Sequence, residues 1–106
     1  MKKTNTKKTN WYDGVELNDE VLITGFTKKI VHEGEKVNKW CVEVARKTPN
    51  NKIARAWLTV VDFDDQLEEG KVYDMSCQIT TGSYKNKKGE TVFTGTEFIV
   101  NEVNEI

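Results

Sequence analysis

The chain has 106 residues, of which 37% are hydrophobic and 31% are charged, and its formal net charge is −1. This length predicts one domain, and the composition is that of an ordinary globular protein rather than of a disordered or fibrous chain. No apolar run approaches the ~20 residues of a membrane span, and the first ten residues lack the apolar stretch of a signal peptide. We therefore predict no membrane partner and a cytoplasmic location.

The cysteines predict no metal centre. Cys41 and Cys77 each lie inside an apolar, strand-like segment without CxxC spacing, and His32 is the only histidine. A structural zinc site needs four soft ligands, which these residues do not supply. We predict no metal and no cofactor, and we expect both thiols to be buried as small apolar groups.

The charge is distributed unevenly. The first ten residues hold four lysines and no acid, so the rest of the chain has 12 basic residues (16 in all, less these four) against 17 acidic ones. Residues 1–10 also have no apolar residue after Met1 and cannot bury enough surface to become ordered. We predict a flexible basic arm at 1–12 and a single domain at 13–106. The arm supplies either phosphate attraction or only solubility, through Lys2, Lys3, Lys7 and Lys8.

The remaining pattern is that of strands. We predict strands at 21–27, 40–46, 53–63, 72–79 and 91–100, with a polar stretch at 28–39 and a basic hairpin tip at 80–90. Gly25 is expected to mark a bulge or a tight bend, and the acidic segment 62–69 is too short for a long helix. No segment has a 3.6-residue apolar period, so the chain is predicted to be all-β. Five short strands favour a small closed barrel over a sandwich.

The third predicted strand has the most informative alternation. One face holds Ala54, Ala56, Leu58 and Val60, and the other holds Arg55, Trp57, Thr59, Val61 and Phe63. The first set suits a barrel interior. The second set places aromatic rings beside a cation, and bases of any identity stack on such rings. The alternative is that these rings cover a second core or another subunit.

Other aromatic residues have more than one interpretation. The predicted hairpin tip carries Tyr84 with Lys85, Lys87 and Lys88. These residues either contact a phosphate backbone or only form a solvated tip that prevents the sheet edges of two molecules from pairing. Trp40 shares a strand face with Val42 and Val44 and is expected in the core or an interface. Trp11 and Tyr12 either cap the barrel or contact a partner.

The acidic cluster raises an enzyme hypothesis. Paired carboxylates can hold Mg²⁺ for phosphoryl chemistry, and the cluster comprises Asp62, Asp64, Asp65, Glu68 and Glu69. It has no histidine or lysine partner in sequence reach and is expected to be a solvated loop. We predict no catalytic residues and no enzymatic activity, with a metal-dependent nuclease as the third choice of function.

Several stretches of the chain resemble a known family. Residues 70–73, 79–90 and 96–100 resemble the last two strands of bacterial and phage single-stranded DNA-binding proteins, and residues 21–25 look like their first strand. Trp57 and Phe63 are similar to a pair of aromatic residues, six apart, that stack on DNA in that family. The resemblance implies a five-stranded OB-fold barrel with little or no helix between the third and fourth strands. It implies a nucleic-acid-binding set of Arg55, Trp57, Thr59, Phe63, Tyr84, Lys85, Lys87 and Lys88.

The departures from the family refine the expectation. The chain stops at Ile106 without the glycine-rich linker and acidic tail of cellular members, so a trimmed form of phage or mobile-element type is expected. The predicted function is sequence-non-specific binding of single-stranded DNA in replication, recombination or repair, with RNA as a further possible ligand. A homo-oligomer, dimer or tetramer, is expected. The alternative function is an OB-fold module for protein interaction or oligomerisation.

Overall fold

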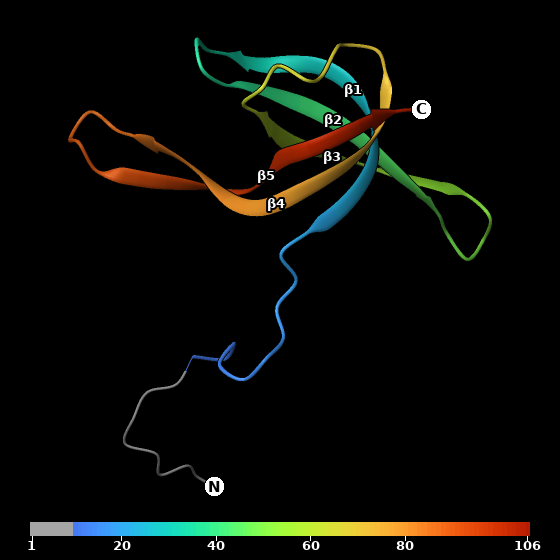
Figure 1. Ribbon diagram of the computed structural model, residues 1–106, viewed down its shortest axis with the longest axis horizontal. Coiled ribbons are helices and arrows are strands. Elements are labelled where there is room, and N and C mark those ends of the chain that lie inside the picture. The colour runs from blue at the N-terminus through green and yellow to red at the C-terminus, as the bar shows by residue number, and fades with distance from the viewer. Residues whose placement is uncertain (1–9) are drawn as a thin grey trace, which may run out of the picture.

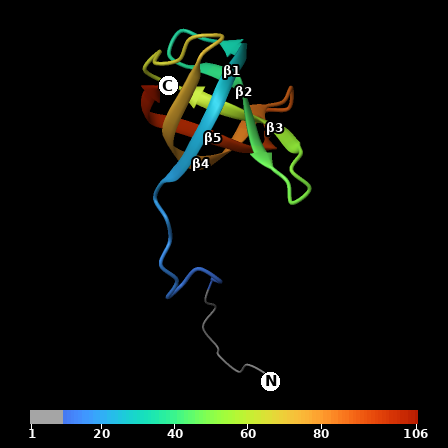
Figure 2. The ribbon, with the colours of Figure 1, turned by 90° about the vertical axis from the view of Figure 1, so that its right-hand side faces the viewer.

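The computed structural model describes residues 10–106, and five strands in them form one closed barrel. Around the barrel the strands follow the order β1-β2-β3-β5-β4, and each neighbouring pair is antiparallel except β3 and β5, which are parallel (Figures 1 and 2). The strands are β1 (Val21–Glu33), β2 (Asn38–Lys47), β3 (Ile53–Asp62), β4 (Val72–Lys85) and β5 (Thr91–Glu105).

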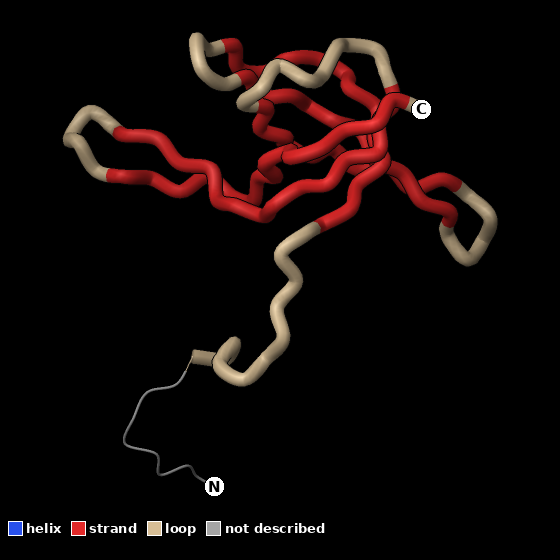
Figure 3. The backbone as a smooth tube through the Cα atoms, in the orientation of Figure 1, coloured by secondary structure: helices blue, strands red, loops and turns tan. Residues whose placement is uncertain are grey.

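The described residues contain strands and loops and no helix, as Figure 3 shows. The predicted all-β, five-stranded OB-fold barrel is therefore confirmed, including the missing helix between the third and fourth strands. Within residues 10–106 no helix is long and apolar enough to cross a membrane. The lysines of the predicted arm, at positions 2, 3, 7 and 8, lie outside the described residues.

The barrel interior is filled by alternate residues of each strand, as the pleat of a β-strand requires. Val42 and Val60 lie in this interior on neighbouring strands and are completely buried, and Trp40 is 6% exposed. The core prediction for Trp40 is therefore confirmed. The buried cluster consists of Ile23, Trp40, Val42, Val60, Leu67, Tyr73, Met75, Cys77 and Val100.

One end of the barrel is closed by the loop 63–71 instead of a helix. The buried Asp62 carboxylate accepts hydrogen bonds from the backbone N–H of Gln66 (3.0 Å) and of Leu67 (2.9 Å), and this turns the Leu67 side chain into the core. The buried Thr27 hydroxyl bonds backbone groups of Glu68 and Lys71 on the same loop. Buried polar groups with such partners are stabilising rather than costly, so a short acidic loop can seal the barrel.

Several strands are longer than predicted. β1 continues to Glu33 and β5 to Glu105, and the predicted hairpin tip at 80–90 is mostly paired strand, because Lys85 still pairs with Thr91. Figure 1 shows the β4–β5 hairpin extending well beyond the barrel. The alternation of β4 predicts that Ile79 shares a buried face with Cys77, yet Ile79 is exposed, because β4 leaves the barrel there.

Two local expectations differ from the structure: a bulge at Gly25 and the burial of Cys41. Gly25 pairs in regular register with Tyr73, and the register shifts of β1 fall at positions 28 and 31 instead. A Cβ on Gly25 would collide with the Val42 side chain, so glycine permits the close approach of β1 and β2. Cys41 is only half-buried rather than buried, because its position on β2 faces away from the core.

Candidate nucleic-acid interface

The outer surface of β2 and β3 is set by the register of these strands. Inward-pointing Trp40, Val42 and Val60 are buried, so the residues that alternate with them point outward. We call this surface the β2–β3 face. Its cross-strand pairs are Lys39 with Val61, Cys41 with Thr59, Glu43 with Trp57, and Ala45 with Arg55.

Two large rings are exposed along this side of the chain. Trp57, in the middle of β3, is 55% exposed, and Phe63, just after β3, is also 55% exposed. On the β1 side, Phe26 pairs with Glu43 and is partly exposed. An aromatic ring held on a strand with an open surface is a platform on which a base can stack.

Glu43 holds two cations beside Trp57. Its carboxylate lies 3.6 Å from Lys28 Nζ and 3.3 Å from Arg55 Nη1. The side chain of Glu43 is 15% exposed, whereas those of Lys28 and Arg55 are 45% and 60% exposed. The acid therefore lies beneath the two cations, and each cation keeps about half of its side-chain surface open to an incoming phosphate. Surface ion pairs of this kind contribute little stability, so their effect is mainly to orient the cations.

A groove continues the β2–β3 face towards the β4–β5 hairpin. Its volume is about 220 Å³, and it shares Lys39 and Val61 with the face. We call it the hairpin groove. Its lining consists of Val37, Lys39, Val61, Phe63, Thr80, Thr81, Gly82, Ser83, Glu97 and Ile99.

A second acid–base pair lies in the hairpin groove. Lys39 Nζ is 3.0 Å from Glu97 Oε1 and 3.2 Å from Oε2, so the ammonium contacts both carboxylate oxygens. A Cβ on Gly82 would collide with the Glu97 carboxylate and with Thr94 Oγ1. Glycine at this position therefore makes the space in which the carboxylate lies.

The hairpin residues of the predicted set are divided between two sides. Tyr84 lies two residues beyond Gly82, on the same side of β4, and is exposed. Lys85 points to the other side. Lys87 and Lys88 are exposed in the tip turn, which Asn86 orders by accepting hydrogen bonds from two backbone N–H groups.

The structure thus brings Arg55, Trp57 and Thr59 together on one face and places Phe63 at its border with the hairpin groove. The hairpin lysines lie at the far end of the β4–β5 hairpin, which extends away from the barrel (Figure 1). Sequence reasoning missed the groove and face residues Lys28, Lys39, Glu43 and Glu97. Charged residues inside or next to apolar strands were a signal, but only the register shows which of them point outward.

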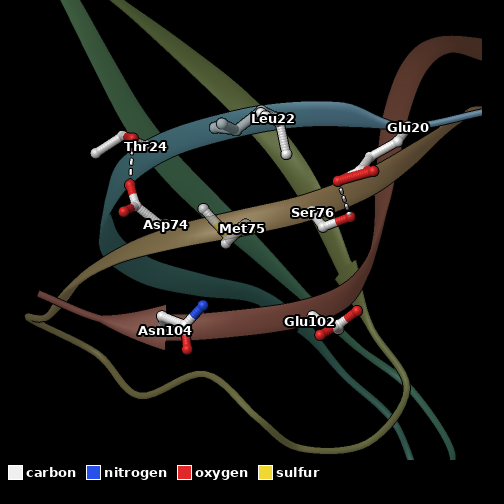
Figure 4. Close-up of a pocket in the computed structure, with 9 residues that line it drawn as sticks. Glu20, Leu22, Thr24, Asp74, Met75, Ser76, Glu102 and Asn104 are labelled. Atoms are coloured by element: carbon white, nitrogen blue, oxygen red, sulfur yellow. Dashed lines mark hydrogen bonds between the residues drawn. The ribbon is translucent and has the colours of Figure 1, made fainter. Parts of the chain in front are cut away.

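A hollow larger than the hairpin groove lies on a different surface, formed by β1, β4 and β5. It has a volume of about 440 Å³, and Figure 4 shows the carboxylates of Glu20, Asp74 and Glu102 around it. Ser76 donates a hydrogen bond to Glu20 (2.9 Å), and Thr24 donates one to Asp74. A surface with three acids repels phosphates, so this hollow does not suit a nucleic acid.

The acidic loop does not form the metal site that a nuclease requires. Both oxygens of Asp62 are used by backbone N–H groups of its own loop. Among residues 10–106, no cluster of three histidine, cysteine or acidic side chains has the geometry to hold a metal ion.

Comparison with known proteins identifies the fold. No protein-family model matches the chain, and no curated protein matches it in sequence. Among solved structures, it is similar to a Plasmodium falciparum SSB in complex with single-stranded DNA, with a TM-score of 0.59, 13% identity, and coverage of 86% of this chain and 97% of that chain. It is also similar to Rim1, a mitochondrial single-stranded DNA-binding protein of Saccharomyces cerevisiae, with a TM-score of 0.52, 13% identity, and coverage of 82% and 93%. At this identity the likeness shows a shared fold, and it agrees with the family that the sequence resembles.

Proposed function

We propose that the protein binds single-stranded DNA without strong sequence preference along the β2–β3 face and the hairpin groove. One observation carries the proposal: Trp57 in β3 and Phe63 just after it each expose more than half of their surface, and Glu43 orients Arg55 beside Trp57. Stacking on a ring is sequence-tolerant, because every base has a π-face. The fold shared with two single-stranded DNA-binding proteins supports the proposal.

The arrangement of side chains suggests a path for the strand. Bases stack on Trp57 and Phe63, with Thr59 between them on the same side of the chain, and phosphates lie along Arg55, Lys28 and Lys39. Beyond the groove the strand meets Tyr84 and then the hairpin lysines, Lys85, Lys87 and Lys88. Stacking itself does not distinguish DNA from RNA, since only a contact to the 2′-hydroxyl does so.

We propose a homo-oligomer as the working form. The side of the hairpin opposite Tyr84 exposes Ile79 and Phe93, which are 63% and 70% exposed. Apolar side chains gathered on one side of a hairpin suit a subunit contact. Measurement of the molecular mass in solution tests the homo-oligomer, and a monomer at all concentrations contradicts it.

The proposal also includes a role in replication, recombination or repair of a phage or mobile element, which the resemblance in sequence supports. It further includes a cytoplasmic location.

The direct test is a titration with fluorescently labelled oligo-dT, followed by anisotropy over a range of salt concentrations. We expect saturable binding whose log K falls linearly with log [salt], because phosphates bound by lysine and arginine release counterions. Lack of binding at about 50 mM salt, by a sample that circular dichroism shows to be folded, would exclude the proposal. Duplex DNA of the same length serves as the comparison, and we expect it to bind more weakly.

The alternative, a protein-interaction module that uses the same rings, makes the opposite prediction. If the β2–β3 face is covered by a second copy, Trp57 becomes protected from a soluble fluorescence quencher as the protein concentration rises. DNA then neither binds nor changes the quenching.

A further inference from the structure

The β2–β3 face continues from β2 onto the outer surface of β1. Phe26 of β1 lies directly opposite Glu43 of β2, and Glu43 lies directly opposite Trp57 of β3. Residues directly opposite each other in antiparallel strands point to the same side of the sheet, with Cβ atoms about 5 Å apart. Phe26 and Trp57 therefore belong to one row, with Glu43 between them and with their Cβ atoms about 10 Å apart.

Phe26 points outward from the barrel wall. Its neighbours along β1, Gly25 and Thr27, are buried, so the side chain of Phe26 lies on the opposite side of the strand. Phe26 is 37% exposed, and its partner on the far side is Val72 of β4. A ring that is already partly packed loses less freedom when a base stacks on it. Phe26 is thus a partly fixed ring with an open surface.

Two cations lie between the two rings of this row. The Glu43 carboxylate pairs with Lys28 of β1 and with Arg55 of β3, so one acid orients a cation on each side of β2. The row therefore consists of an aromatic ring, a pair of cations and a second aromatic ring. A single nucleic-acid strand offers the complementary order of base, phosphate and base, and bases of any identity stack on such rings.

The aromatic rings at the start of the described chain lack this setting. Trp11 and Tyr12 are 79% and 43% exposed, in a turn that Figure 1 shows well away from the barrel. Neither ring caps the barrel, so that interpretation of their sequence is wrong. Residues 10–20 around them include four acids and no base. Nothing in this turn is arranged to hold a phosphate beside a ring, as Lys28 and Arg55 are.

We propose that Phe26 is a base-stacking subsite on β1, and that the bound strand crosses β2 between Trp57 and Phe26. This inference rests on the function proposed above and extends the path of the strand. The strand runs along β3 from Phe63 to Trp57 and then turns across the sheet, with a phosphate at Lys28 and Arg55.

The acidic hollow sets the end of this path. Two residues before Phe26 on β1, Thr24 donates a hydrogen bond to Asp74, and both residues line the hollow. Its carboxylates repel phosphates, so the strand does not continue along β1 in that direction. Phe26 is therefore the last ring that the strand contacts on this side of the barrel.

The test is an anisotropy titration with oligo-dT of about 16 nucleotides, the upper end of the length that one OB-fold occupies. Phe26→Ala removes the ring. Phe26→Leu also removes it but keeps a large apolar side chain, which preserves the test if the alanine variant does not fold. Phe26→Tyr keeps the ring. Val72→Ala is the matched control, because Val72 is apolar, lies opposite Phe26 and is equally exposed. Urea unfolding checks that each variant is folded.

We expect Phe26→Ala and Phe26→Leu to raise the Kd about fivefold, the lower part of what one stacked base contributes, because only part of the ring is open. Phe26→Tyr and Val72→Ala should leave the Kd close to that of wild type. If Phe26→Leu binds as tightly as wild type while Trp57→Ala is weakened, the subsite on β1 is overturned and the proposed function stands. Equal losses in Val72→Ala and Phe26→Ala also overturn it, because apolar surface and not stacking is then responsible. If the wild type does not bind, the proposed function fails together with this inference.

Discussion

Replacing Trp57 with alanine tests the proposed interface at its centre. Removing one ring from a stacked base costs about 1–3 kcal/mol. Trp57 is 55% exposed in the free protein, so almost half of its surface already contacts the protein and is not available to a base. We therefore expect the lower part of that range, about 1–2 kcal/mol, which is a 5- to 30-fold rise in Kd. Because the ring is outside the core, the free energy of unfolding should fall by no more than about 1 kcal/mol.

The assay is the anisotropy titration with oligo-dT, with stability measured in parallel by urea unfolding. Leu22→Ala is the matched control, since Leu22 is even more exposed but lies on β1 at the acidic hollow. Trp57→Phe retains a ring and should recover part of the lost affinity. If Trp57→Ala binds within twofold of wild type, or if Leu22→Ala is equally impaired, base stacking on the β2–β3 face is refuted.

The ion pairs and the core give three further predictions. Glu97→Gln releases Lys39 for a phosphate, so oligo-dT affinity at low salt should rise about two- to fivefold, and the log–log salt slope should steepen by up to about 0.7; weaker binding would contradict this. Asp62→Ala leaves two backbone N–H groups of the loop 63–71 without their acceptor, which should cost about 2–3 kcal/mol in urea unfolding, and a cost below about 0.5 kcal/mol would show that water replaces the carboxylate. Burial raises the pKa of Cys77 to about 11 from 9.0, so the unfolded chain loses this proton first. Between pH 9 and 11 the folded protein keeps the proton and the unfolded chain does not. The free energy of unfolding should therefore fall by about 1.4 kcal/mol per pH unit over this range, and Cys77→Ala should remove that part of the pH dependence.

The barrel and its rings were predictable because both leave a local signal. Strict alternation in the third strand is enough to separate Val60 from Trp57, and the absence of a helical period excludes helices. The extension of β4 to Lys85 leaves no such signal, since a hairpin that extends beyond the core is not patterned by burial. Lys39 and Glu97 lie far apart in the sequence, and only the parallel pairing of β3 with β5, together with the β2–β3 register, brings them together. Side chains that meet through long-range register are not visible in a single sequence.

Glu43 and Glu97, lying beneath their lysine and arginine partners, have a consequence for selectivity. They offset much of the positive charge of the β2–β3 face and the hairpin groove while leaving the rings open. A duplex offers a protein mainly phosphates and would gain little from such a surface. An unpaired strand also offers its base faces, and stacking is unaffected by the nearby acids. If the proposed function holds, we therefore expect the protein to bind separated strands in preference to duplex DNA.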